Sequence, residues 1–204
     1  MATGSETRAQ RTLRRYLEQV QKKLDVEVVD VFFAEYVAPG EDMDEVMEAL
    51  DELQRWKEEG VIRYVGATVH SRALALELIE CGRVEVLMHR YNMAHRGAEE
   101  KVLPAALAAA MPVVAFTCTR WGSLLAGHGQ WQGPVPKAGD CYRYALDHKA
   151  VQLALTAPQN AAELRENLAI LNNLDLAEGE RETWEEYGAL VYGDGRDAFE
   201  NEWP

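Results

Sequence analysis

Residues 28–67 read VVDVFFAEYVAPGEDMDEVMEALDELQRWKEEGVIRYVGA and contain two short β-branched and aromatic runs on either side of an amphipathic stretch. The run Val28–Ala34 has the composition of a buried strand, and Ile62–Ala67 is a second. Between them, residues 43–58 keep their apolar side chains on one helical face, and Gly60 stands where a helix commonly ends in a left-handed residue. A strand, a helix and a strand in this order predict a right-handed crossover between parallel strands.

The same alternation continues on both sides of this unit. Residues 7–24 form an amphipathic helix pattern, with Thr7 and Gln10 spaced as a capping box. Further strands are expected at Val84–Met88, Val113–Cys118 and Val151–Leu155, and further helices at 72–81, 98–110, 140–147, 160–174 and 180–191. We therefore expect one α/β domain over residues 1–204, built from five parallel strands that are each followed by a helix.

Composition excludes several classes of function. The 204 residues include 21 Lys or Arg and 34 Asp or Glu, which gives a net charge of −13. A surplus of carboxylates disfavours both nucleic acid and an anionic membrane surface as partners. We find neither a hydrophobic signal segment nor an apolar run long enough to span a bilayer, so a cytoplasmic location is expected. The three cysteines are widely spaced, which favours reduced thiols over a disulfide or zinc framework: Cys81, Cys118 and Cys141.

Several short motifs, in a fixed order, resemble the aldo-keto reductase family. They are VDVF at 29–32, GVIRYVGA at 60–67, RYN at 90–92, VLP at 102–104, VAF at 114–116 and ELRENL at 163–168. The likeness runs from about Thr7 to Asn173. It implies a (β/α)8 barrel that binds NADPH across its strand ends and reduces carbonyls to alcohols. Because such a barrel has eight strands, the sequence predicts a partial barrel that lacks the first three strand–helix units, with no strand before Thr7.

The catalytic tetrad that the resemblance implies is an Asp, a Tyr acid, a Lys that lowers the Tyr pKa, and a His. The first three belong to the first three strand–helix units, which we expect this chain to lack. The strand that carries the family His ends here in Glu35. One steroid double-bond reductase group of the family also has Glu at this position. Glu35 is therefore the catalytic candidate, with a raised pKa if its surroundings are partly apolar; the alternative is a solvated carboxylate at the rim.

The resemblance also assigns positions to the nicotinamide end of the cofactor. Thr68-Val69 stands where the family holds the carboxamide with Ser-Asn, and Met88 stands where it has Gln. Phe116 matches the aromatic residue that stacks on the nicotinamide ring, and it offers a π face.

The remaining cofactor positions lie further along the chain. Thr117 and the turn Gly122-Ser123-Leu124 match the pyrophosphate region, where hydroxyls and backbone amides suit phosphate. Glu166 and Asn167 match the adenine contacts. The 2′-phosphate region reads Ala157-Pro158-Gln159-Asn160 and is followed by Glu163, without a cation. NADPH is the implied cofactor, and the charged half of its site is the weaker half.

Other constellations have two interpretations each. The loop Gly122–Gly139 is either a lid over the ligand site or a surface insertion. Glu35, His70, His89 and His95 lie near one rim, but their spacing matches no ligand motif, so we expect no metal site. Cys118 is either a nucleophile activated by Arg120 or a buried, inert thiol. The aromatic residues of the C-terminal segment are expected to pack a terminal helix onto the barrel: Trp184, Tyr187, Tyr192, Phe199 and Trp203.

Two functions follow from these expectations. The first is that of an aldo-keto reductase-like chain that is inactive alone, because three tetrad residues are lacking and Glu35 replaces the fourth. The second is that of a non-catalytic binding or regulatory subunit. An unclosed parallel sheet exposes backbone groups and apolar surface, so the expected partners are a second copy of the chain or a polypeptide that completes the barrel.

Overall fold

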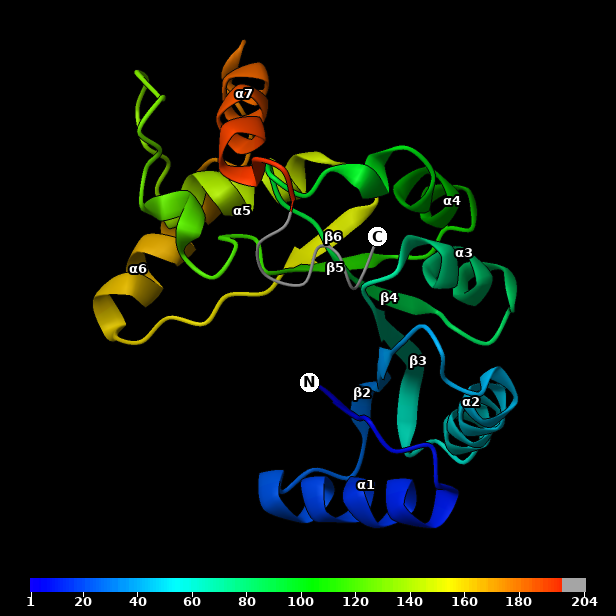
Figure 1. The fold of residues 1–204 in the computed structure, drawn as a ribbon. Coiled ribbons are helices and arrows are strands. Elements are labelled where there is room, and N and C mark those ends of the chain that lie inside the picture. Colours follow the sequence, from blue (N-terminus) through cyan, green and yellow to red (C-terminus); the bar gives the residue numbers. More distant parts are fainter. Residues whose placement is uncertain (196–204) are drawn as a thin grey trace.

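The computed structural model describes residues 1–195, and all of its strands lie in one parallel sheet whose order follows the chain (Figure 1). The strands are β1 (Ala2–Ser5), β2 (Val29–Val37), β3 (Ile62–Val69), β4 (Val86–Arg90), β5 (Val113–Phe116) and β6 (Val151–Ala154). The helices are α1 (Gln10–Leu24), α2 (Met43–Glu58), α3 (Arg72–Glu80), α4 (Val102–Ala108), α5 (Ala138–Asp147), α6 (Ala161–Ala169) and α7 (Glu180–Tyr192). Three short 3-10 turns, η1 (Gly97–Glu99), η2 (Ser123–Leu125) and η3 (Ile170–Asn172), lie between them. The predicted partial (β/α)8 barrel is confirmed.

The first strand is a correction to the sequence-based count. Five strands were expected, and none before Thr7, but Ala2–Ser5 pairs in parallel with β2, with Ala2 opposite Val31 and Ser5 opposite Ala34. The Asp30 amide donates to the Met1 carbonyl at 2.9 Å, which continues the ladder. Ala, Thr, Gly and Ser carry little strand preference of their own, so this strand depends on its neighbour. Six of the eight strands of a complete barrel are therefore present, not five.

Most other elements lie where the sequence places them, with small shifts at their ends. Helix α1 begins at Gln10, and its N-cap Ala9 has no side-chain capping bond. The predicted capping box of Thr7 and Gln10 is therefore wrong: Thr7 Oγ1 instead accepts a bond from the Ala9 amide, at 3.2 Å. The strand predicted at Val113–Cys118 is β5, and it ends at Phe116 because Thr117 has a left-handed backbone, with φ of 53°.

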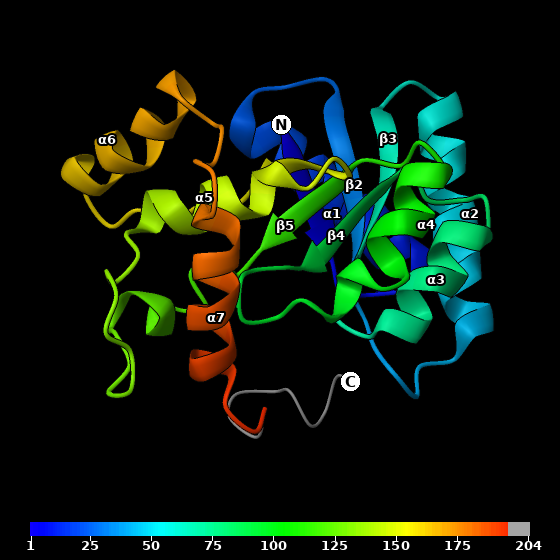
Figure 2. The same ribbon diagram turned by 90° about the horizontal axis from the view of Figure 1, so that it is seen from above.

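The core lies between the sheet and the helices on its outer face (Figures 1 and 2). Phe32 of β2 packs edge-on against Trp56 of α2, with ring centroids 5.3 Å apart, and both side chains are fully buried. On the opposite face of β2, Phe33 lies over Gly66 of β3, where a Cβ would come within 2.4 Å of the Phe33 ring. Gly66 thus lets a large aromatic side chain fill the inside of the curved sheet.

Helix α7 is held against the loops that follow β4 and β5 by specific contacts. Arg181 pairs with Glu99 at 3.1 Å, and the Tyr187 hydroxyl donates to the Leu124 carbonyl at 2.7 Å. A Cβ at Gly188 would lie 2.0 Å from the Met93 carbonyl oxygen, so only glycine permits this approach. The expected aromatic packing is confirmed for Trp184 and Tyr187, which are buried, and for Tyr192, which is partly buried against the core. Phe199 and Trp203 lie outside the described residues.

The sheet is open along both edges. Within residues 1–195, strand β1 is bonded only to β2, and β6 only to β5. Exposed leucines occur on β6, on α6, in η3 and in the residues that follow β6 and η3, and each is 41% or more exposed: Leu153, Leu155, Leu164, Leu168, Leu171 and Leu174. We call this set the leucine face. Among residues 1–195, none of the helices has the length and apolar character that crossing a membrane requires.

Candidate functional site

The carboxyl ends of the strands bring several predicted residues into two neighbouring rows. Thr68 is in register with Met88, and Thr68 Oγ1 lies 3.6 Å from the Met88 sulfur. One step further along the strands, Arg90 of β4 is in register with Phe116 of β5. Residues in register on parallel strands point to the same face, and so do residues two apart on one strand. Thr68, Met88, Arg90 and Phe116 therefore share the inner face of the sheet.

Glu35 lies on this inner face, beside β1. It is half-buried, and burial is the main cause that raises the pKa of its carboxyl, with the nearby Glu6 adding to it. Gly4 of β1 faces it so closely that a Cβ there would lie 2.6 Å from Glu35 Cγ. Arg8 donates to the Glu35 backbone carbonyl at 3.0 Å, while its guanidinium pairs with Glu41. The Glu35 carboxyl is thus desolvated and makes no ion pair within residues 1–195, which favours its protonated form.

An aromatic row, missed by the sequence analysis, crosses the strand ends. The ring of Tyr36 is stacked on that of His70 with centroids 6.1 Å apart, and His70 meets Phe116 edge-to-face at 4.9 Å. Contact with His70 covers part of the Phe116 ring, the predicted nicotinamide platform. His70 follows β3 directly, so its position at a strand end was the feature of the sequence that could have predicted its place in this row.

The predicted pyrophosphate residues lie in a tightly wound loop after β5. Thr117, Arg120 and Trp121 have left-handed backbones, and Gly122 continues them with φ of 86°. The Thr117 hydroxyl is buried and makes no hydrogen bond within the described part of the chain, whereas its carbonyl accepts from Asn92 Nδ2 at 2.8 Å. Leu124 is buried in the core. The loop thus offers one buried hydroxyl, while Leu124 serves packing.

The predicted adenine and 2′-phosphate residues are engaged in the local fold. Asn160 caps α6 by accepting from the Ala162 and Glu163 amides, both at 3.0 Å, and Glu163 accepts from the Gln159 amide at 2.8 Å. Asn167 is buried and donates to Thr156 Oγ1 at 2.6 Å. Glu166 is exposed on the same helix.

The residues present therefore fit only part of the NADPH that the resemblance implies. The inner-face residues Thr68 and Phe116 and the buried Thr117 hydroxyl suit a nicotinamide and its linkage. At the start of α6, the first amides are already bonded to Asn160, Glu163 adds negative charge, and residues 156–164 contain no Lys or Arg. A 2′-phosphate has no cationic partner there.

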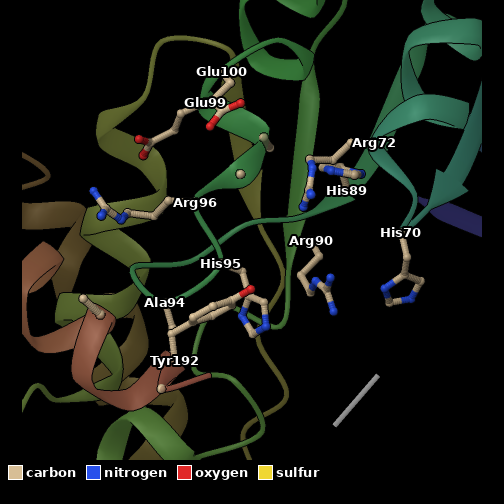
Figure 3. A pocket seen from close by; sticks show the side chains of 14 residues that line it. His70, Arg72, His89, Arg90, Ala94, His95, Arg96, Glu99, Glu100 and Tyr192 are labelled. Carbon is tan, nitrogen blue, oxygen red and sulfur yellow. The ribbon is translucent and has the colours of Figure 1, made fainter. Parts of the chain in front are cut away.

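A cavity of about 550 Å³ lies at the ends of β3 and β4 (Figure 3). It is lined by His70, His89, Arg90 and His95 from the strand ends and the loop after them, and by Arg72 at the start of α3. Ala189 and Tyr192 of α7 contribute to its wall. The sequence analysis had considered these histidines only as metal ligands and had not singled out the two arginines.

The three histidines of the cavity are neutral at pH 7. Burial lowers the pKa of His70 and His89 to about 4 and that of His95 to about 3, and the charge of Arg90 adds to each shift. His89 Nδ1 lies 2.8 Å from the Val69 carbonyl, so this nitrogen carries the proton. Among residues 1–195, no three His, Cys, Asp or Glu side chains are placed to hold a metal ion.

The two remaining alternatives are decided differently. Cys118 is 1% exposed, and burial raises the pKa of its thiol to about 12, so the activated nucleophile is wrong. The neighbouring Arg120 donates to the Val191 carbonyl at 2.6 Å and ties the loop to α7. Within the loop Gly122–Gly139, the Trp131 ring lies 5.4 Å from that of Tyr187, so the loop packs on α7. Its role as a lid stays a prediction.

Comparison with known proteins agrees with this architecture. A family model described as the aldo/keto reductase family matches residues 2–188, and so includes β1, which the sequence analysis had left out. A search of curated proteins gave no match.

Solved aldo-keto reductases have the same fold. AKR11C1 from Bacillus halodurans, in its holo form, is 18% identical, with a TM-score of 0.78 over 97% of this chain and 76% of that chain. The thermostable Tm1743, in complex with the inhibitor epalrestat, is 21% identical, with a TM-score of 0.72 over 91% of this chain and 69% of that chain. Since the family model covers most of the sequence, the chain belongs to the aldo/keto reductase family, whose members generally use NADP(H).

Proposed function

We propose that this chain, taken alone, does not catalyse the NADPH-dependent carbonyl reduction typical of its family. The observation that carries the proposal is the packing of Glu35 against Gly4. The resemblance gives the tetrad Lys to the third strand–helix unit and the His to the fourth. With six strands present, β1 corresponds to the third strand, and it reads Ala-Thr-Gly-Ser, without a lysine.

The chemistry of Glu35 supports the same conclusion. Carbonyl reduction needs an acid that delivers a proton to the developing alkoxide. A carboxyl with a raised pKa is a candidate acid, but the Glu35 side chain fills the space beside Gly4. In the family a Lys lowers the pKa of the Tyr acid, and neither β1 nor β2 contains a lysine that could play this part. The start of α6 has no Lys or Arg to pair with a 2′-phosphate, which further weakens the binding of NADPH.

Two measurements test this proposal. Consumption of NADPH is followed by its absorbance with an aromatic aldehyde and with a ketone, and NADPH binding is followed by quenching of tryptophan fluorescence. We expect no turnover above the protein-free rate. Turnover that Glu35→Gln abolishes, and that the matched variant Glu27→Gln at the other end of β2 retains, would overturn the proposal.

A second candidate function is assembly, and the leucine face favours it. Leu164, Leu168 and Leu171 are 41%, 51% and 66% exposed on α6 and η3, the elements that follow the edge strand β6. In an eight-stranded barrel, two more strand–helix units would stand between β6 and β1 and cover this region. We propose such a strand–helix segment, on this or another polypeptide, as the occupant.

Sedimentation of the isolated chain tests the assembly proposal. Without the covering segment, we expect self-association through the leucine face, because exposed apolar surface and open strand edges favour it. The double variant Leu168→Gln/Leu171→Gln should shift the chain toward monomer. The control Leu107→Gln, which changes an equally exposed leucine on α4, should not. A wild-type chain that sediments as a monomer over a wide concentration range would refute this proposal.

A further inference from the structure

Helices α1 and α2 are neighbours of opposite charge. Helix α1 carries five Lys or Arg and one Glu, a net charge of +4, although the whole chain has a net charge of −13. Helix α2 carries six Asp or Glu and two Lys or Arg, a net charge of −4. Arg14 joins the two helices, because it pairs with Glu59 at 2.7 Å and lies over the Trp56 ring. The outer surface at this end of the sheet therefore has a basic and an acidic half.

The basic half consists of four exposed cations of α1, which we call the basic face: Arg11, Arg15, Lys22 and Lys23. None of them makes an ion pair within residues 1–195, where only Arg14 does so on this helix. Arg11, Arg15 and Lys22 recur at helical spacing on the side of α1 that points away from the core. Glu18, the one carboxylate of this row, is already paired with Arg14 at 3.7 Å.

The acidic half consists of four exposed carboxylates of α2, which we call the acidic face: Asp44, Glu45, Glu48 and Glu58. None of them makes an ion pair in the part of the chain that the structure describes. The remaining charges of α2 are paired, Asp51 with Arg83, Glu52 with Arg55 and Lys57 with Glu85. Four unpaired cations on one helix thus lie next to four unpaired carboxylates on its neighbour.

This separation of charge is unfavourable within a single chain. Arg11 lies in the first turn of α1, which has no acidic residue, although the helix dipole disfavours a cation there. Arg11 and Arg15 are also one turn apart, where like charges repel. Glu58 ends α2, and the dipole disfavours an anion at that end. Opposite charge supplied from outside the chain would offset these local costs.

The arrangement of the two faces selects a second copy of the chain as the partner. Because the basic and acidic faces are neighbours, a two-fold rotation about an axis between them places each basic face on the acidic face of the other copy. Four cations then meet four carboxylates at each of two equivalent contacts. Pairing of α1 with the exposed Glu182 and Glu186 of α7 would instead join copies head to tail, without forming a closed pair.

We propose that the chain forms a weak, reversible two-fold dimer in which the basic face of each copy docks on the acidic face of the other. Helices α1 and α2 have 15 and 16 residues, so each is about 22–24 Å long and about 10 Å wide, and together they present about 450 Å². Stable complexes bury about 800 Å² per partner. The dimer is therefore expected to dissociate readily.

The dimer uses different elements from the assembly proposed above. Figure 1 shows α1 and α2 at the end of the sheet that carries β1, β2 and β3, whereas α6 of the leucine face follows β6 at the other end. The two proposals therefore hold or fail separately.

The net charge of −13 on each copy opposes self-association, so ionic strength decides the balance. In 0.1 M salt the screening length is about 10 Å, which suppresses repulsion between distant charges but leaves attraction between groups in contact. In 1 M salt the screening length falls to about 3 Å, and the contacts themselves weaken. We therefore expect a dimer in 0.1 M salt and a monomer in 1 M salt.

Sedimentation equilibrium tests the proposal in the Leu168→Gln/Leu171→Gln chain, in which the leucine face is disrupted. Added to this chain, Arg11→Glu/Arg15→Glu should weaken dimerisation about tenfold or more, because it places like charges at both contacts. Failure of the leucine-face proposal would not affect this measurement, since both leucines are already replaced.

Reversal of the opposite face provides the decisive comparison. Glu48→Lys/Glu58→Lys should weaken dimerisation to a similar extent. In an equimolar mixture of the two reversed chains, however, the reversed basic face meets the reversed acidic face at one contact, and the native faces meet at the other. The mixture should therefore form a mixed dimer about as tightly as the chain in which neither face is reversed.

The matched control is Lys101→Glu/Lys149→Glu, which changes the net charge as much as the reversal of Arg11 and Arg15. Both lysines are exposed, before α4 and after α5, so the control should dimerise like its parent chain. Any of three results would overturn the proposal. They are a parent chain that stays monomeric in 0.1 M salt up to millimolar concentration, a mixture that associates no better than its components, and equal weakening by the control.

Discussion

The close approach of α7 to the loop after β4 predicts a large effect for a one-carbon substitution, Gly188→Ala. Alanine favours a helix over glycine by about 1 kcal/mol, so propensity alone predicts stabilisation. The structure predicts the reverse. The new Cβ would lie 2.0 Å from the Met93 carbonyl oxygen and 2.4 Å from its carbonyl carbon, and ordinary contacts are at least about 1 Å longer than the first of these.

Relief of this clash requires movement of backbone, since the obstructing atoms belong to a main-chain carbonyl. Overpacking of this kind costs about 3 kcal/mol, against the gain of about 1 kcal/mol from helix propensity. We therefore expect a net loss of about 2 kcal/mol, which lowers the Tm by about 4–8 °C for a chain of this size.

Thermal unfolding followed by circular dichroism measures the predicted loss. The matched control is Gly139→Ala in α5, where the nearest atom to a new Cβ is a side-chain methyl, Ile170 Cγ2, at 3.0 Å. That methyl can move, so the control should lie close to wild type or above it. A Tm for Gly188→Ala equal to or above that of wild type would refute the close approach of α7.

Three more predictions concern titration and ion pairs. Burial raises the pKa of Glu35, so the folded chain holds this proton more tightly than the unfolded chain and loses stability as the pH rises through the folded-state pKa. In urea unfolding, Glu35→Gln should therefore stabilise the chain at pH 7 but not below about pH 4. The control Glu27→Gln should show no such dependence on pH. Burial holds the pKa of His89 at about 4, so stability should fall as the pH decreases from about 6.5 to 4, a range in which only the unfolded chain takes up this proton. A smaller fall in His89→Asn would identify His89 as the titrating group. A pH profile unchanged by this substitution would contradict that assignment. Arg181→Gln removes the ion pair with Glu99 and should lower the free energy of unfolding by about 1–2 kcal/mol. A loss near zero in urea unfolding would mean that this ion pair contributes no more than an ordinary surface pair.

Much of the fold could be predicted from the sequence because its signals are local. The apolar periodicity of residues 43–58 and the β-branched run before them were sufficient to place α2 and β2. Strand β1 was missed because Ala2–Ser5 has no such pattern, and it is a strand only through pairing with β2. Helix α1 likewise starts at Gln10, three residues later than predicted, and its N-cap Ala9 has no side-chain capping bond that the sequence could signal.

The candidate site was only partly predictable. Thr68 and Met88 were both assigned to the nicotinamide end of the cofactor, and Thr68 Oγ1 lies 3.6 Å from the Met88 sulfur, as their parallel register requires. The burial of Asn167 and its bond to Thr156 depend on how α6 folds back, which no local pattern encodes. Arg72 and Arg90 lie 18 positions apart, and only the pairing of β3 with β4 brings them to one cavity.

The agreement between strand order and chain order has a consequence for engineering. Every strand pairs only with its sequence neighbours, so the six strands form a linear series whose two free edges belong to β1 and β6. A two-unit insert that closes the ring could therefore be fused ahead of Met1, or supplied as a separate polypeptide, without rethreading any existing connection. The chain thus suits split-protein reporters, in which reconstitution of the ring reports the meeting of two fused partners.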